Sequence, residues 1–340
     1  MSEFRRIAGF EDVWRPPVSR RLRPESVLRP AASGDQVRAR LARIAQRTPE
    51  VMVKVTGRTR DPAHLRAHLD YVTRNGALAL ETPDGLRLDR AEVRDLGDTW
   101  SAAALADSRR RANSPFSLSL VLSMPEATDP YAVRDAARGF AATAFGETFD
   151  YGFVLHTDEP HPHVHVTVQC LGRGGERLNP KKADLEAWRQ AFAAALRERG
   201  VAAEATPRRA RGVTRKAERG PIRRLRERTL SGLGAPARVQ RSAYRAAAQA
   251  AFLGADEPTA WERRLLARQR QVRALYLGQA RLLQASDDAG DQVLGRQVEA
   301  FVREMPAPDT QRLALARDLR AANARRRAGP ETDRGPDRSR

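Results

Sequence analysis

The sequence predicts an α+β fold, in which a mixed segment of strands and helices precedes a helical region. Residues 50–205 alternate between short β-branched runs of period two and longer runs of helical period. Residues 238–325 are rich in Ala, Arg, Gln and Leu and contain no strand pattern. The composition changes at about residue 206, so we expect a domain boundary there.

The elements of the mixed segment follow from periodicity and from capping residues. A short helix is expected at 35–47, followed by a strand at 51–56, a helix at 62–75 with Pro in its first turn and Gly after its end, a hairpin around Pro83-Asp84-Gly85 and a helix at 89–112. The chain continues with a strand at 117–125, a helix that opens at Asp129 and Pro130, strands at 150–158 and 161–172, and a helix that stops at Gly200.

Composition divides the whole chain into five predicted regions. They are a basic, mostly disordered arm at 1–48, a catalytic domain at 49–206, a basic linker at 207–236, a helical region at 237–325 and a disordered tail at 326–340. We find no internal repeat.

The charge of the chain points to a polyanionic partner. Lys and Arg number 61 against 42 Asp and Glu, which gives a net charge of +19. Nucleic acid is the first expectation and an anionic membrane surface the second. No apolar run approaches the ~20 residues of a membrane span. Cys170 is the single cysteine, which excludes an internal disulfide. These features predict a cytoplasmic protein.

Four of the six histidines lie between residues 156 and 165. In a strand, alternate residues share a face, so His163 and His165 point the same way while the valines between and after them point into the core. His156 ends the preceding strand. Imidazole is a common metal ligand, and three protein ligands leave positions open for substrate. The pattern favours a catalytic metal site over a set of merely buried histidines.

Neighbouring residues can assist this site. His161 joins the face only if its strand begins early, and otherwise it belongs to a turn. Asp158 and Glu159 are either solvated turn residues or acceptors that orient an imidazole. A metallohydrolase that activates water would show a similar pattern.

A helix that precedes the histidine strands carries a candidate nucleophile. His64, His68 and Tyr71 share one helical face, and Arg74 forms a basic rim beside Tyr71. The alternative is a tyrosine that only packs its ring at the edge of the core. Tyr151 and Tyr131 are rival nucleophiles.

Four segments resemble, in order and spacing, the conjugative relaxases of the MobP class, which belong to the HUH endonucleases and include enzymes that nick T-DNA borders. They are "HLDYVTRNG", "LSMPEATDP", "HTDEPHPHVHVTV" and "RLNPKKADLEAWRQAFAAALRERGV". The resemblance covers roughly residues 50–212. It implies a mainly antiparallel sheet of about five strands, with the strands at 117–123 and 162–170 side by side and the histidines on the exposed face.

The resemblance also implies site-specific nicking and rejoining of one DNA strand at a plasmid transfer origin. Tyr71 matches the nucleophile that becomes linked to the 5′ end, and Ser123 matches a serine that helps to place the DNA. His156, His163 and His165 match the ligands of a divalent ion, Mg²⁺ or Mn²⁺. The implied partners are single-stranded DNA, accessory relaxosome proteins and a type IV coupling protein. His64 and His68 have no counterpart that we can place.

DNA-backbone contacts are expected from Arg74 and from the basic run that begins after Pro207. This run holds ten basic and two acidic residues up to Arg228; its candidate contacts are Arg208, Arg209, Arg211, Arg215 and Lys216. A solvated linker is the alternative for the run. Two other functions stay open, a rolling-circle replication initiator with the same site and a non-enzymatic DNA-binding protein with a structural metal. Formation of a covalent adduct with DNA excludes the second of these.

Overall fold

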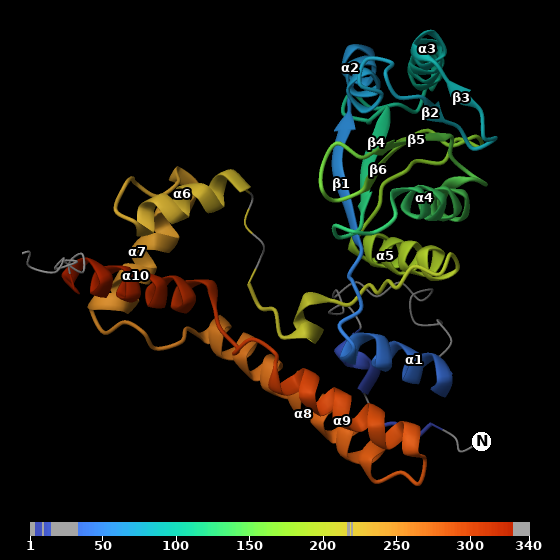
Figure 1. Ribbon diagram of the computed structural model, residues 1–340. Coiled ribbons are helices and arrows are strands. Elements are labelled where there is room, and N and C mark those ends of the chain that lie inside the picture. The colour runs from blue at the N-terminus through green and yellow to red at the C-terminus, as the bar shows by residue number, and fades with distance from the viewer. Residues whose placement is uncertain (1–3, 9, 15–32, 216–217, 219, 329–340) are drawn as a thin grey trace, which may run out of the picture. The chain divides into compact units, whose positions relative to one another are not determined.

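The computed structural model describes residues 4–8, 10–14, 33–215, 218 and 220–328. The chain divides into two compact units. The first, here the sheet unit, spans Pro16–Thr206, and the second, here the helical unit, combines Met1–Arg15 with Pro207–Arg340. The units are described separately (Figure 1).

A six-stranded antiparallel sheet with the order β1-β4-β6-β5-β2-β3 forms the centre of the sheet unit. The strands are β1 (Met52–Thr59), β2 (Leu80–Glu81), β3 (Arg87–Leu88), β4 (Ser117–Ser123), β5 (Tyr151–His156) and β6 (His163–Gln169). The expectation of about five strands is one too low, because both arms of the Pro83-Asp84-Gly85 hairpin join the sheet as strands of two residues each. The predicted adjacency of β4 and β6 is confirmed.

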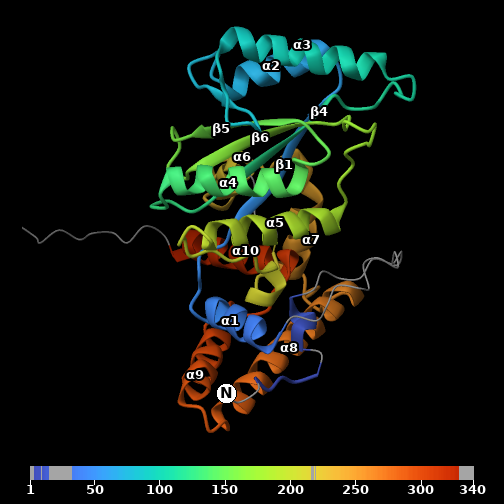
Figure 2. The same ribbon diagram turned by 90° about the vertical axis from the view of Figure 1, so that its right-hand side faces the viewer.

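Helices cover both faces of the sheet (Figures 1 and 2). One face packs on α4 (Pro130–Phe145) and α5 (Lys182–Arg197) and forms the larger core, to which β6 contributes Val164, Val166 and Val168. The other face packs on α2 (Pro62–Val72) and α3 (Arg90–Ala106) through a smaller core. The predicted α+β class is therefore confirmed. The expectation that the histidines lie on an exposed face is wrong for His156 and His165, which are buried on the side of the sheet that α2 covers.

Local chemistry sets the ends of α2. Asp61 caps its start by accepting a hydrogen bond from the backbone N–H of His64, and Pro62 occupies the first turn. The helix ends at Val72, before the predicted residue 75, because Arg74 and Asn75 have φ of +52° and +57°. Gly76 follows with φ of +90°, and a Cβ there would lie 2.6 Å from the Cβ of Arg90. The glycine is therefore required by both conformation and space.

Within the described residues, the helical unit contains five α-helices and several 3-10 turns. They are α6 (Gly220–Leu230), α7 (Arg241–Phe252), α8 (Ala260–Gln284), α9 (Ala289–Arg303) and α10 (Gln311–Ala328), with 3-10 turns η1 (Phe10–Val13), η3 (Arg208–Arg211) and η4 (Arg238–Gln240). The helical character predicted for 237–325 is confirmed. The tail predicted from 326 is helical up to Ala328, and its remainder, 329–340, lies outside the described residues.

The predicted disordered arm at 1–48 is wrong where the structure describes it. Phe10, Val13 and Trp14 are buried, and the Trp14 Nε1–H donates to the Tyr276 hydroxyl of α8 at 2.9 Å. The short helix predicted at 35–47 is confirmed as α1 (Gly34–Ala45), capped by Ser33. Residues 1–3, 9 and 15–32 of the predicted arm lie outside the described residues. Aromatic burial outweighs the high Arg and Pro content of this segment.

The predicted linker at 207–236 is also wrong in part, because η3 and α6 fold within it. An ion pair stabilises this region: Arg226 of α6 lies 2.8 Å from Glu218 and 3.2 Å from Asp318 of α10. Gly212 ends η3 with φ of +74°, a conformation that favours glycine.

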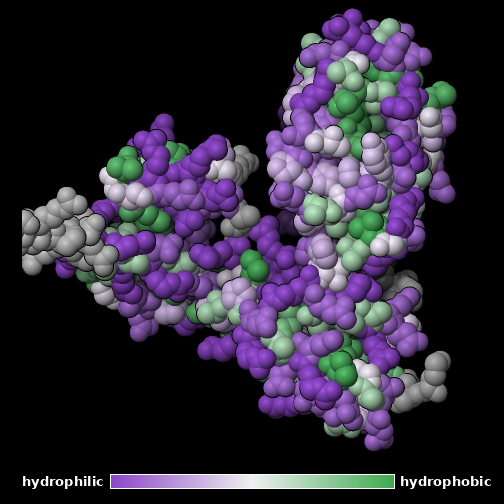
Figure 3. All heavy atoms as spheres, viewed as in Figure 1, coloured by the Kyte–Doolittle hydropathy of each residue, from purple (hydrophilic) through white to green (hydrophobic). Residues whose placement is uncertain are grey.

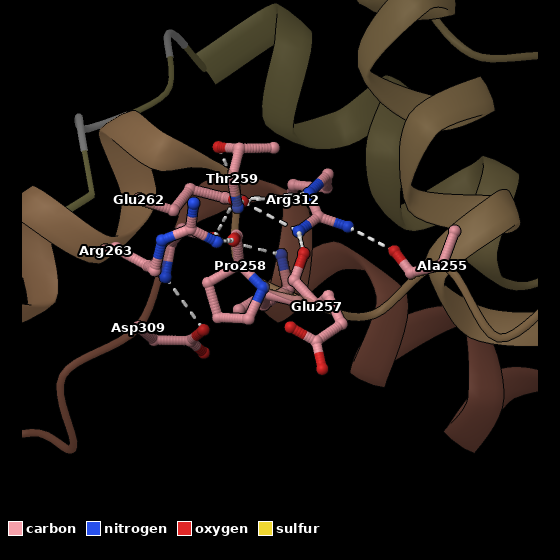
Figure 4. Close-up of polar contacts among 10 residues, drawn as sticks. Ala255, Glu257, Pro258, Thr259, Glu262, Arg263, Asp309 and Arg312 are labelled. Carbon is pink, nitrogen blue, oxygen red and sulfur yellow. Dashed lines mark hydrogen bonds and ion pairs between the residues drawn. The ribbon is translucent and has the colours of Figure 1, made fainter.

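A buried carboxylate joins the start of α8 to the start of α10 (Figure 4). Glu262 is fully buried and lies 2.7 Å from Arg312. Its carboxylate also accepts hydrogen bonds from the Thr310 hydroxyl at 2.6 Å and from the Thr259 backbone N–H at 2.8 Å. Arg312 in turn donates to the carbonyls of Ala255 and Glu257. A buried charge of this kind is tolerated because its oxygens are paired and hydrogen-bonded.

The molecular surface is mostly hydrophilic in the view of Figure 3, with hydrophobic residues in small separate groups. Among the described helices, none has the length and apolar character that crossing a membrane requires.

Candidate active site

Three histidines meet at the ends of β5 and β6. His156 and His163 are directly paired across the two strands, and His165 lies two residues further along the same face of β6. The ring centroids are 5.2 Å apart for His156–His163, 4.4 Å for His156–His165 and 5.2 Å for His163–His165. One ring nitrogen from each residue lies within 4.8 Å of the others. The strand register thus creates a set of three convergent nitrogens, here called the histidine triad.

The hydrogen-bond partners of each imidazole determine which of its two nitrogens has a lone pair for a metal ion. His156 Nε2 lies 2.7 Å from the Val72 carbonyl, and a carbonyl only accepts, so Nε2 carries the proton and Nδ1 has a lone pair. By the same reasoning, His163 donates from Nδ1 to the His161 carbonyl at 3.1 Å and leaves Nε2 free as a ligand. His165 Nδ1 is buried with no hydrogen-bond partner in the described part of the chain.

Burial favours the neutral form of two histidines of the triad. It lowers the pKa of His156 and lowers the pKa of His165 to about 3, with nearby histidines adding to the shift of His165. Three imidazole nitrogens that lie within 4.8 Å of one another form a donor set that a divalent transition metal can take. The residues present therefore fit a metal ion.

Arg74 and Asp158 flank the triad. The Arg74 guanidinium lies 3.2 Å from His156 Nδ1 and forms a close ion pair with Asp158. Asp158 itself is 3.8 Å from His156 Nδ1, and because this nitrogen carries no proton, the carboxylate acts on the imidazole through Arg74. Glu159 is exposed. The His161 side chain is also exposed, and β6 begins only at His163, so His161 reaches the triad through its carbonyl alone.

Tyr71 lies over the triad from the last turn of α2. Its side chain is 56% exposed, and its ring meets the His165 ring edge to face, with centroids 6.0 Å apart. The Arg74 guanidinium lies 5.4 Å from the Tyr71 ring. The two rival tyrosines are placed differently: Tyr151 is 2% exposed within the larger core, and Tyr131 lies in the first turn of α4 on the other face of the sheet.

Ser123 is the last residue of β4 and pairs directly with His163. Its side chain is buried, and its hydroxyl lies 3.3 Å from the Met124 carbonyl. The register therefore brings Ser123 to the strand end that carries the triad.

The shared helical face of His64, His68 and Tyr71 is only partly reproduced. His64 is exposed, whereas His68 is half-buried and its Nε2 lies 2.8 Å from the Ser119 hydroxyl and 3.0 Å from the Thr167 hydroxyl. The spacing of His64, His68 and Tyr71 predicted their shared helical face. It could not predict the partners of His68, because both hydroxyls lie far away in the sequence.

The predicted DNA contacts of the basic run belong to the helical unit. Arg208, Arg209 and Arg211 form η3, and Arg215 is exposed after it. Lys216 lies outside the described residues. Arg74, in contrast, lies at the triad.

Comparison with known proteins finds a family similarity within the sheet unit. Residues 87–201 match the family Relaxase: MobA/VirD2-like, nuclease domain. This range includes the triad and Ser123 but begins after Tyr71. Over these residues the chain is similar to a MobA/VirD2-like relaxase nuclease domain.

The similar curated proteins are T-DNA border endonucleases. The T-DNA border endonuclease VirD2 of Rhizobium radiobacter is 26% identical over 183 residues, covering 48% of this chain and 43% of the relative. VirD2 of Agrobacterium fabrum is 27% identical over 188 residues, covering 48% of this chain and 41% of the relative. The chain thus spans less than half the length of these relatives.

A solved structure, the MobM relaxase domain bound to a 26-nucleotide pMV158 oriT DNA, covers 50% of this chain and 95% of its own. It is 10% identical, with a TM-score of 0.38.

Proposed function

We propose that the relaxase domain nicks one strand of DNA at a transfer origin by tyrosine transesterification and later rejoins it. The observation that carries this proposal is the position of Tyr71, whose ring lies against the histidine triad while most of its side chain stays exposed. An attacking hydroxyl beside a set of convergent metal ligands is an arrangement that supports phosphoryl transfer from DNA.

In the proposed reaction, the Tyr71 oxygen attacks the phosphorus of the scissile phosphodiester. The bond between phosphorus and the 3′ oxygen breaks, so the phosphate stays on Tyr71 with the 5′ end of the downstream DNA. The Tyr71 hydroxyl gives up its proton as it attacks, and the 3′ oxygen takes up a proton and leaves as a hydroxyl, so no net proton is gained or lost. One ester is exchanged for another, so the reverse attack by a 3′ hydroxyl rejoins the strand without ATP.

The side chains around Tyr71 have distinct roles in this proposal. A divalent ion held by His156, His163 and His165 would offset the negative charge that develops on the phosphate oxygens. Arg74 places a permanent positive charge beside the Tyr71 ring, where it can contact a phosphate oxygen. Asp158 forms an ion pair with Arg74 and lies close to His156. Ser123, which pairs with His163, is proposed to contact the DNA.

The ligand set bears on the choice of metal. Mg²⁺ prefers oxygen ligands, whereas imidazole is a usual ligand of transition metals. Three imidazoles with no carboxylate among them therefore favour Mn²⁺ over Mg²⁺ as the activating ion.

The proposed role is conjugative mobilisation. The two VirD2 relatives are named T-DNA border endonucleases, which supports strand-specific nicking for DNA transfer. Single-stranded DNA at the origin is the proposed substrate, and accessory relaxosome proteins with a type IV coupling protein are the proposed partners. The net charge of +19 suits a nucleic-acid substrate.

An adduct assay tests the proposal. The protein is incubated with single-stranded oligonucleotides tiled across the intergenic DNA beside its gene, with Mn²⁺ or Mg²⁺. A 3′-labelled oligonucleotide should give a labelled protein that resists denaturant, and a 5′-labelled one should give a shorter free product. Two free fragments would indicate a hydrolase, and binding without cleavage would indicate a DNA-binding protein.

A further inference from the structure

His68 makes the polar contact between α2 and the two strands at the centre of the sheet. Its Nε2 lies 2.8 Å from the Ser119 hydroxyl of β4 and 3.0 Å from the Thr167 hydroxyl of β6. Ser119 and Thr167 are directly paired across the strands and both are buried. One imidazole nitrogen therefore joins α2 to a cross-strand pair.

This cross-strand pair lies next to the metal site. Thr167 follows His165 by two residues on the same face of β6. His68 itself precedes Tyr71 by three residues on α2, which is about one helical turn. The contact therefore links the helix that carries Tyr71 to the strand that carries two residues of the triad.

The contact holds for either tautomer of His68. Hydroxyl groups both donate and accept, so Ser119 and Thr167 can satisfy Nε2 with or without its proton. Burial lowers the pKa of His68 to about 4, which keeps the ring neutral and avoids an unpaired charge beside the triad.

The position of the Tyr71 hydroxyl depends on α2, since this hydroxyl makes no hydrogen bond with any residue that the structure describes. The apolar stripe of Leu65, Leu69 and Val72 anchors α2 to the smaller core, and apolar contacts are not directional. Polar contacts with the sheet add direction at two points: His156 of β5 donates to the Val72 carbonyl at the end of α2, and His68 bonds to two buried hydroxyls of β4 and β6 one turn before Tyr71.

We propose that His68 is a positioning residue, which fixes α2 on β4 and β6 and thereby holds Tyr71 over the histidine triad. The inference rests on the proposed function, in which Tyr71 is the nucleophile. Misplacement of a reacting group by 1 Å can cost about 100-fold in rate, so a small shift of α2 is enough to affect nicking.

The test compares variants of the full chain in single-turnover nicking of the cognate oligonucleotide with Mn²⁺. His68→Leu removes the polar contact and should slow nicking by about tenfold or more. Affinity for the uncleaved oligonucleotide, measured without metal, and affinity for Mn²⁺, measured by calorimetry, should stay within about twofold because neither surface is altered. His68→Gln retains a side-chain N–H and should restore most of the rate.

His64→Leu is the matched control. His64 lies on the same helix one turn earlier, but its side chain is exposed, so its loss should leave nicking unchanged. Hydrogen exchange of the α2 amides should be faster in His68→Leu and unchanged in His64→Leu. If His68→Leu fails to fold, the double variant Ser119→Ala/Thr167→Val removes the same contact from the sheet and should show the same slow nicking.

Nicking at the wild-type rate by His68→Leu, or by the double variant, would overturn the inference and leave the proposed function standing. A parallel loss of Mn²⁺ affinity would also overturn it, because His68 would then act through the metal site. Failure of the wild-type chain to form any adduct would instead reject the proposed function.

Discussion

The rings of Tyr71 and His165 meet edge to face, with 6.0 Å between their centroids and 85° between their planes. This relationship leads to the first prediction. Tyr71→Phe keeps the ring contact and removes only the hydroxyl, so the variant should fold, bind single-stranded DNA and form no covalent adduct. Denaturing gel electrophoresis with 3′-labelled DNA measures the adduct.

Two other tyrosines serve as controls for this variant. Tyr131→Phe alters an exposed ring on α4 and should leave the adduct unchanged. Tyr151→Phe alters a ring in the larger core, so any effect should appear in stability. An adduct that persists in Tyr71→Phe and disappears in Tyr151→Phe would show that Tyr71 is the wrong nucleophile.

The second prediction concerns the metal ligands. His163→Ala or His165→Ala leaves two nitrogens of three, so metal-dependent nicking should be abolished while binding of single-stranded DNA is mostly retained. Binding depends on Lys and Arg contacts over the surface and not on the triad. Nicking is measured after EDTA treatment and resupply of Mn²⁺, and binding by fluorescence anisotropy. Unchanged nicking by both variants would rule out the three-histidine site.

The third prediction concerns the basic run of the helical unit. Arg208, Arg215, Arg224 and Arg228 are exposed, whereas Arg226 is held by Glu218 and Asp318. Changing the four exposed arginines to Gln should weaken binding to all DNA sequences alike. It should also reduce the slope of log K against log salt by about 3, since each lost phosphate contact removes about 0.7 for a single strand.

The matched control for the run carries four changes of exposed arginines on α3 and the segment after it: Arg90, Arg94, Arg109 and Arg111 to Gln. It has the same net charge and should change the salt slope less. Equal slopes for the two quadruple variants would mean that the run contributes only through overall charge.

The fourth prediction concerns the two units. A fragment of residues 16–206 contains the triad, Tyr71 and both cores of the sheet unit. It should still form the adduct but fail to support transfer between cells in a mating assay, where partners are needed. A cut near residue 230 is a poorer design, because it separates Trp14 from Tyr276 and exposes a buried aromatic cluster. A folded fragment without activity would show that the helical unit takes part in nicking.

The fifth prediction concerns acid stability. Burial would raise the pKa of Glu262, but hydrogen bonds from Arg312, Thr310 and Thr259 outweigh it and lower the pKa from 4.5 to about 2. Because the folded pKa lies below the unfolded one, the stabilisation is complete above about pH 4.5 and is lost as the pH falls toward 2. Glu262→Gln should therefore destabilise the helical unit at pH 7 by on the order of 3 kcal/mol.

Chemical unfolding at several pH values checks this prediction. The difference in stability between wild type and Glu262→Gln should shrink between pH 4.5 and 2. Glu257→Gln is the control, because its side chain is exposed and only its carbonyl takes part in the network. If the difference in stability between wild type and Glu262→Gln does not depend on pH, the variant has lost packing and not the interactions of the charge.

The sheet and its triad were predictable because their signals are local. The period of two along β6 placed His163 and His165 on one face and the intervening valines in the core, as the structure confirms. Asp61 and Pro62 marked the start of α2 for the same reason.

The contacts that sequence reasoning missed are those between distant residues. His68 meets hydroxyls that lie 51 and 99 residues away, and no spacing rule connects them. The segment from Phe10 to Trp14 is too short to show a period, so its burial could not be separated from the surrounding Arg- and Pro-rich sequence.

The contact between Trp14 and Tyr276 has a consequence for biosynthesis, because its partners are 262 residues apart. At ~5–20 residues per second, Tyr276 is synthesised roughly 10–50 s after Trp14. The sheet unit lies between these two residues in the sequence and can fold on the ribosome in that time. Phe10 and Trp14 stay unburied until α8 emerges, so they become buried only after the sheet unit has been synthesised, and during this interval they offer a site for chaperone binding.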